Sequence, residues 1–385
     1  LLVEASGALN GSIQLSPADG ATQAALAKVT ARKLVFGEHH AGQMIIDASV
    51  ADAFGSPRVD AKLKGRDVVA ANIEIRTIDG TVSTSGTTTD FTVTSKLARH
   101  NAEVSSSGQV VQKDGVTEIS LNDLRLRSSI SNARLVAPAR IRFSDGVTRL
   151  SNIELAIGRG SVKIKGTAGE TLDLSSTISA LPLSIINAVQ PDIQAAGTLD
   201  GQIRITGTAS DPAAVFKLSG RGVSAAPVAE AGLAPLAITA DGRFAGQTVT
   251  LQRVTARNAQ DINITASGKV PLKGSGLDVS ITGTAPLSIA RAALIERGAS
   301  LSGAARFDLT VRGSIDRPQS QGRITVTNGT LADPLSNLKL VGIALSAQVS
   351  DKTVSINQMQ ARLATGGSIS GRGTVGLTEL LPANI

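Results

Sequence analysis

Apolar and polar residues alternate along much of the chain. Between Arg306 and Arg312 the apolar side chains are those of Phe307, Leu309 and Val311, and polar or charged residues separate them. Side chains of a β-strand point alternately to opposite faces, so this pattern predicts strands with one apolar and one polar face. Gly, Asp, Asn and Ser interrupt the pattern about every 8–12 residues, a spacing typical of all-β proteins.

Strands with one polar face are typical of antiparallel sheets that are wetted on one side. A parallel sheet would instead show continuous apolar runs and long intervening helices, and the sequence contains neither. We therefore predict an all-β fold, built as an elongated, twisted antiparallel repeat sheet with one or two short inserted helices.

Few stretches carry a helix signal. The Ala-rich residues 22–28 could form two helical turns. A proline suits the first turn of a helix, so we predict a short helix after Pro182 that Pro191 should stop. A second short helix is predicted to begin at Pro286 and to end at Gly298, a residue type that favours helix termination.

The chain contains internal repeats, which are typical of modular arrays. Residues 57–71 align without gaps on residues 212–226, with eight of fifteen positions identical. The sequence Pro-Leu-Ser-Ile at 182–185 returns at 286–289. The predicted domains are a region of divergent β-repeats at 1–181, a module of a short helix followed by strands at 182–285, and a second copy of that module at 286–385.

Composition narrows the possible functions. Hydrophobic residues make up 42% of the chain but aromatic residues only 2%, so the apolar faces consist mainly of Ile, Val, Leu and Ala. The absence of Cys excludes disulfides and thiolate metal sites. No apolar run approaches the roughly 18–20 residues that span a bilayer. Because the chain begins with Leu1 and shows no signal-peptide pattern, we expect it to be an excerpt of a longer protein.

No motif supports catalysis or a cofactor, and we predict neither an enzyme nor a metal site. His39 and His40 are adjacent, so on a strand they would point to opposite faces. Residues 371–376 match G-x-G-x-x-G, but Pro382 leaves no room for the helix that this motif requires.

The net charge of +7 could indicate nucleic acid, an anionic membrane surface, or solubility alone. A basic zone contains Arg125, Arg127, Arg134, Arg140, Arg142 and Arg149. It lacks the aromatic platforms that bind single-stranded nucleic acid, so no nucleic-acid partner is predicted. The zone is either the solvated outer face of strands or a surface attracted to anionic lipid head groups.

Burial of apolar surface contributes about 25 cal/mol per Å², so we expect the apolar faces to be shielded from water. The residues alone leave three ways open: a facing sheet, closure of the sheet on itself, or a bound apolar ligand. Aliphatic strands with few aromatic residues would form smooth walls suited to acyl chains. An ordinary sandwich or a β-solenoid core is the alternative.

One pattern points to a known family. It consists of residues 182–185, Gly197, residues 201–208 and Pro212, and it is repeated over 286–318. This pattern resembles the TamB family, within the AsmA-like group of Gram-negative envelope proteins, well over 182–385 and loosely over 1–181.

The resemblance implies a sheet curled into a taco- or gutter-like trough that is apolar inside. It also implies a periplasmic protein with an inner-membrane anchor and a segment that docks on an outer-membrane barrel of the TamA type, neither of which is recognisable in this chain. TamB-like proteins are thought to carry phospholipids between the two membranes and to support outer-membrane protein assembly.

We therefore expect a non-enzymatic lipid conduit in which phospholipid acyl chains lie against the apolar face. The alternative is a scaffold that binds outer-membrane β-protein clients by strand augmentation at open sheet edges. The lipid-groove candidates are Ile203, Ile205, Val249, Leu251, Ile262, Ile264, Leu277, Val279, Ile281, Phe307, Leu309, Val311, Ile324 and Val326.

Overall fold

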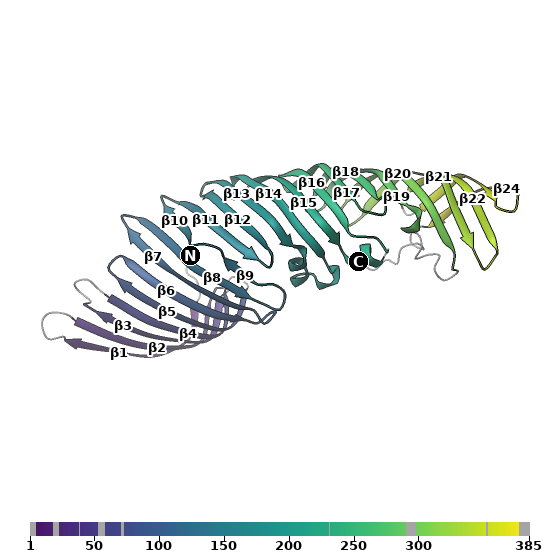
Figure 1. Ribbon diagram of the computed structural model, residues 1–385. Coiled ribbons are helices and arrows are strands. Elements are labelled where there is room, and N and C mark those ends of the chain that lie inside the picture. Colours follow the sequence, from purple (N-terminus) through teal and green to yellow (C-terminus); the bar gives the residue numbers. More distant parts are fainter. Residues whose placement is uncertain are drawn as a thin grey trace. The chain divides into compact units, whose positions relative to one another are not determined.

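The computed structural model consists almost entirely of antiparallel strands (Figure 1). It describes residues 5–17, 23–37, 39–52, 58–70, 73–230, 232–289, 298–351 and 353–376. The chain divides into two compact units, Leu1–Leu181 (unit 1) and Pro182–Ile385 (unit 2). The predicted all-β fold is confirmed, whereas the further division of unit 2 into two modules stays a prediction.

In unit 1 each strand pairs with the next along the chain, except that β9 and β10 together occupy one strand position between β8 and β11. All of these pairings are antiparallel. The strands are β1 (Ala5–Pro17), β2 (Gln23–Phe36), β3 (His39–Ala51), β4 (Arg58–Ala70), β5 (Ile73–Ser85), β6 (Thr88–Leu97), β7 (Glu103–Lys113), β8 (Val116–Arg127), β9 (Ala133–Leu135), β10 (Ala139–Ser144), β11 (Val147–Ile157), β12 (Gly160–Ala168) and β13 (Thr171–Pro182).

Unit 2 follows the same rule without exception, because every strand from β14 to β24 is antiparallel to its chain neighbour. Its strands are β14 (Ala196–Thr208), β15 (Pro212–Ser224), β16 (Leu236–Ala245), β17 (Thr248–Arg257), β18 (Asn263–Pro271), β19 (Ser275–Pro286), β20 (Ser300–Ser314), β21 (Pro318–Asp333), β22 (Leu338–Ser350), β23 (Thr353–Leu363) and β24 (Ser368–Gly376).

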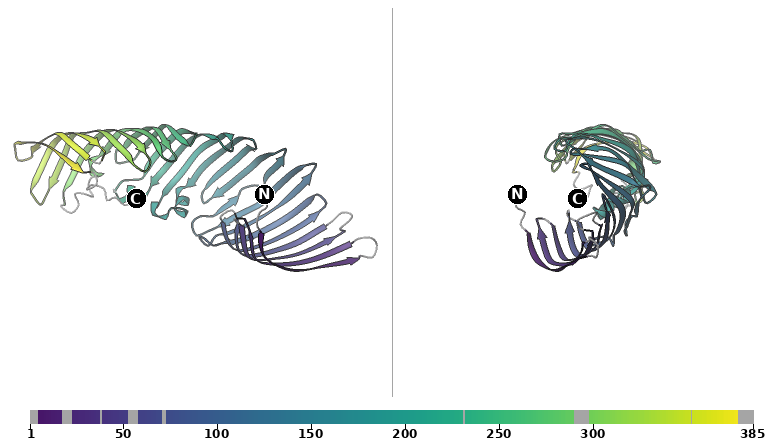
Figure 2. Two further views of the ribbon diagram at one scale, coloured as in Figure 1. Left: turned by 180° about the vertical axis from the view of Figure 1, so that it is seen from behind. Right: turned by 90° about the vertical axis from the view of Figure 1, so that its left-hand side faces the viewer.

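Each unit is a single layer over the residues that the structure describes. Strands contact chiefly their neighbours in the sheet, and no second sheet covers either face. The long strands bend along their length, so neither sheet is flat (Figure 2). A small core forms on β21 to β24 in unit 2, around buried Leu340, Ile343 and Ala361. Most apolar side chains are therefore only partly buried.

An extra residue interrupts the strand ladder at the same level of four neighbouring strands in unit 1. These residues are Lys33, Gly42, Asp67 and Arg76, on β2 to β5. Lys33 and Asp67 adopt left-handed backbone conformations, with φ of 50° and 52°. Extra residues of this kind bend a strand and increase its twist. Each extra residue also shifts the alternation of apolar and polar positions by one. Apolar residues before and after it therefore lie on the same face of the sheet.

The helical segments are short, and most of them are not α-helices. After Pro182 the chain forms two 3₁₀ helices, η1 (Leu183–Ala188) and η2 (Pro191–Ile193). A third segment, α1 (Ala226–Glu230), was not predicted. Residues 287–289 form a 3₁₀ turn, and the rest of the predicted second helix, 290–297, lies outside the described residues.

The helix predicted over residues 22–28 is wrong. Residues 23–28 belong to β2, which pairs with β1 on one side and β3 on the other. Alanine has a high helix propensity, but pairing on both edges with strands of the same length overrides it.

Candidate functional site

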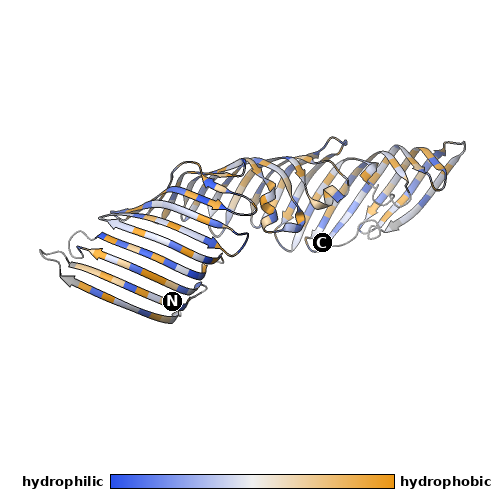
Figure 3. Cartoon of the chain, turned by 60° about the horizontal axis from the view of Figure 1, so that its bottom comes forward, coloured by the Kyte–Doolittle hydropathy of each residue, from blue (hydrophilic) through white to orange (hydrophobic). Residues whose placement is uncertain are grey.

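The register of unit 2 places the predicted groove residues on one face of one sheet. Directly opposed residues of an antiparallel pair project to the same face. Thirteen of the fourteen candidates lie on strands, and all thirteen share this face, which we call the apolar face of unit 2. Figure 3 shows the alternation of apolar and polar residues along the strands.

Rows of opposed side chains cross several strands on this face. One row contains Ile203, Phe216, Gly242, Leu251, Gly268, Val279 and Val311, from β14 to β20. A second contains Ile205, Ala214, Phe244 and Val249. A third contains Val254, Ala266, Ile281, Leu309, Gly322 and Val349. A fourth contains Ile264, Gly283, Phe307, Ile324 and Ala347, and a fifth contains Ala285, Ala305, Val326 and Leu345. Leu277 precedes Val279 by two residues and lies opposite Gly313.

Ile262 is the candidate that does not lie on a strand. It belongs to the loop between β17 and β18, where its N–H donates to Asn258 Oδ1 at 3.2 Å. Ile262 is 4% exposed, Val326 6% and Val279 8%, and the other candidates are half-buried. The alternation Ile262, Ile264 suggested a strand position, but the Asn258 side chain holds this loop apart from the ladder.

The structure adds apolar residues that the sequence prediction did not include. Phe216, Phe244, Leu345 and Val349 complete the rows on β15, β16 and β22. Their signal in the sequence was the alternation of Ala214, Phe216 and Leu218 and its counterparts. The apolar face therefore extends over more strands than predicted.

Phenylalanine rings lie across glycines of the neighbouring strand. Phe216 is opposite Gly242, and a Cβ added to Gly242 would be 2.5 Å from Phe216 Cζ. Phe307 and Gly283 form a second pair, with a corresponding distance of 3.1 Å. A ring in this position covers the exposed backbone of the glycine. The two phenylalanine rings thus lie against the sheet and project little from its apolar face.

The opposite face of unit 2 carries cross-strand polar pairs. Arg221 Nη2 is 2.6 Å from Asp200 Oδ2, and Arg312 Nε is 3.1 Å from Asp278 Oδ1. The hydroxyls of Thr239 and Thr255 are 2.7 Å apart. These exposed pairs contribute little to stability individually. They mark this side as the solvated face of the sheet.

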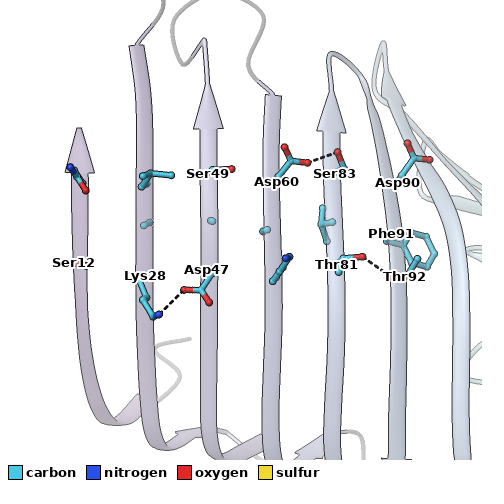
Figure 4. Close-up of a pocket in the computed structure, with 17 residues that line it drawn as sticks. Ser12, Lys28, Asp47, Ser49, Asp60, Thr81, Ser83, Asp90, Phe91 and Thr92 are labelled. Atoms are coloured by element: carbon cyan, nitrogen blue, oxygen red, sulfur yellow. Dashed lines mark hydrogen bonds and ion pairs between the residues drawn. The ribbon is translucent and has the colours of Figure 1, made fainter. Parts of the chain in front are cut away.

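A hollow of about 640 Å³ lies on the polar face of β1 to β6 in unit 1 (Figure 4). Its polar side chains bond to one another: Lys28 Nζ is 3.7 Å from Asp47 Oδ1, and Ser83 Oγ donates to Asp60 Oδ1 at 2.6 Å. No histidine lines it. The hollow can offer hydrogen bonds to a polar ligand.

Among the described residues, no group of three or more His, Asp or Glu side chains could hold a metal ion. His39 and His40 are neighbours on β3 and both are exposed. In the part of the chain that the structure describes, no helix has the length and apolarity needed to cross a membrane.

Comparison with known proteins gives one match. The family model described as the TamB C-terminal domain matches residues 145–333. The matched region runs from the turn before β11 to the end of β21, so it includes strands of both units. No curated protein and no solved structure matches the chain.

Proposed function

We propose, from the match of residues 145–333 to the TamB C-terminal domain, that the chain carries phospholipids between the inner and outer membranes of a Gram-negative envelope. The resemblance to the TamB family implies a protein of transport and assembly rather than an enzyme. In this proposal the chain works in the periplasm, and an outer-membrane barrel of the TamA type receives the lipid.

The observation that carries the proposal is the uncovered apolar face of unit 2. Its rows run from β14 to β22, and no second sheet lies against them within the described residues. Burial of an acyl chain contributes about 0.8 kcal/mol per methylene. Because similar aliphatic side chains repeat from strand to strand, a chain that moves along the face exchanges one set of contacts for an equivalent one. Movement between positions therefore costs little.

A lipid-transfer assay between donor and acceptor vesicles tests the proposal. The variant Ile264→Lys with Ile281→Lys places two charges on the apolar face of β18 and β19. We expect the purified protein to accelerate transfer of a labelled phospholipid and this variant to lose most of the acceleration, because a charge in an apolar contact is costly to desolvate.

The matched control uses the same two strands. Thr265 and Thr282 are directly opposite each other, exposed, and on the polar face. Thr265→Lys with Thr282→Lys should transfer lipid at the normal rate. Equal rates for the apolar-face variant and the wild-type protein would contradict the proposal.

A further inference from the structure

Unit 1 gathers arginines on one face of three adjacent strand positions. Arg134 on β9 lies directly opposite Arg125 on β8. Arg142 on β10 lies directly opposite Arg149 on β11, and Arg140 precedes Arg142 by two residues, on the same face. With Arg127, these six residues form what we call the arginine strip.

The strip lies on the polar face of its strands. Ile141 alternates with Arg140 and Arg142, and it is opposed by Ile119 and Leu150 on the other face. All six arginines are exposed. Phe143, the aromatic residue of β8 to β11, also belongs to the other face, because it follows Ile141 by two residues.

Ion pairs within the fold neutralise little of this charge. Arg125 is paired with Asp123, with 3.0 Å between Nε and Oδ1. The other five arginines form no ion pair within 4.0 Å with the described residues, although Glu118 is opposite Arg142 and Glu103 is opposite Arg127. Like charges directly opposite each other destabilise a sheet. The two opposed arginine pairs, which lie toward opposite ends of β8, are therefore unfavourable for folding, and an anion from outside the chain would compensate them.

We propose that the arginine strip docks unit 1 on a membrane surface rich in anionic phospholipids. Guanidinium groups bind phosphate oxygens in a bidentate manner, and clusters of basic residues are attracted to anionic head groups. The strip lacks the aromatic anchors that dominate protein interfaces and the platforms that bind single-stranded nucleic acid. A fluid layer of head groups can adapt to an array of arginines on a curved sheet and requires no complementary shape.

Vesicle flotation of the full chain tests this inference. The wild-type protein should bind phosphatidylcholine vesicles that contain phosphatidylglycerol, should not bind vesicles of phosphatidylcholine alone, and should bind less as salt is raised. Each arginine near an anionic surface strengthens binding about fivefold, so Arg142→Gln with Arg149→Gln should weaken it about 25-fold.

The control removes the same net charge elsewhere. Arg243 and Arg306 are exposed on the polar face of unit 2, and Arg243→Gln with Arg306→Gln should retain nearly full binding. An equal loss in both variants, or equal binding to both kinds of vesicle, would overturn the proposal. So would a wild-type protein that binds a single-stranded oligonucleotide or an acidic protein but no vesicle.

This docking surface is distinct from the lipid-carrying face. The arginine strip belongs to the polar side of unit 1, whereas the proposed transfer residues belong to the apolar side of unit 2. Failure of lipid transfer with normal flotation would contradict only the proposed function. Failure of flotation with normal lipid transfer would contradict only the proposed docking surface.

Discussion

In the aligned segments 57–71 and 212–226, a glycine, an arginine and a valine surround a residue with left-handed backbone. That residue is Asp67 in the first segment and Gly222, with φ of 61°, in the second. The valine that follows folds back over the glycine: a Cβ added to Gly220 would be 2.6 Å from Val223 Cγ2. The repeated residues thus encode a bulge, a local bend that preserves the apolar face.

Gly222→Ala should destabilise the protein by about 1–2 kcal/mol through backbone conformation alone. Nothing lies within 4 Å of the added Cβ, so steric overlap makes no contribution. Gly373→Ala is the control, because its Cβ also meets no atom within 4 Å and its φ is not in the positive range. Urea unfolding measures both, and equal stability of the two variants would contradict the assignment.

At the scale of single elements, alternation was sufficient to predict most strands and the common face of thirteen of the fourteen candidates. A period of two fixes the face of Val279 or Leu309 without knowledge of the neighbours. The Ala-rich start of β2 could not be predicted as a strand, because it shows no clear alternation of apolar and polar residues. Its strand conformation depends on pairing with β1 and β3. The extra residues of β2 to β5 were also not predicted, since a single extra residue is hard to recognise in a short pattern.

At the scale of the whole molecule, stability is expected to be local. Strands contact chiefly their sequence neighbours, and contacts separate the chain into two units. Arrays of this kind behave as sums of neighbouring interactions rather than as one cooperative core. The repeats in the sequence indicated such an array.

Val279→Ala should cost about 1–3 kcal/mol, because Val279 is buried on the central strand of three. Hydrogen exchange should quicken in β18 to β20 and stay unchanged in β4 to β8. The reciprocal variant Val93→Ala on β6 should quicken exchange around β5 to β7 only. Loss of protection throughout the chain in either variant would show instead that the molecule unfolds as one body.

The pairing of each strand with its successor also governs how such a sheet can change size. Neighbouring strands are about 4.8 Å apart, so one inserted hairpin lengthens a unit by about 10 Å and leaves every existing pair intact. Insertion or loss of hairpins can therefore change the length of a unit in fixed steps. A protein that must match the width of a compartment can do so by gene duplication, without redesigning any strand it already has.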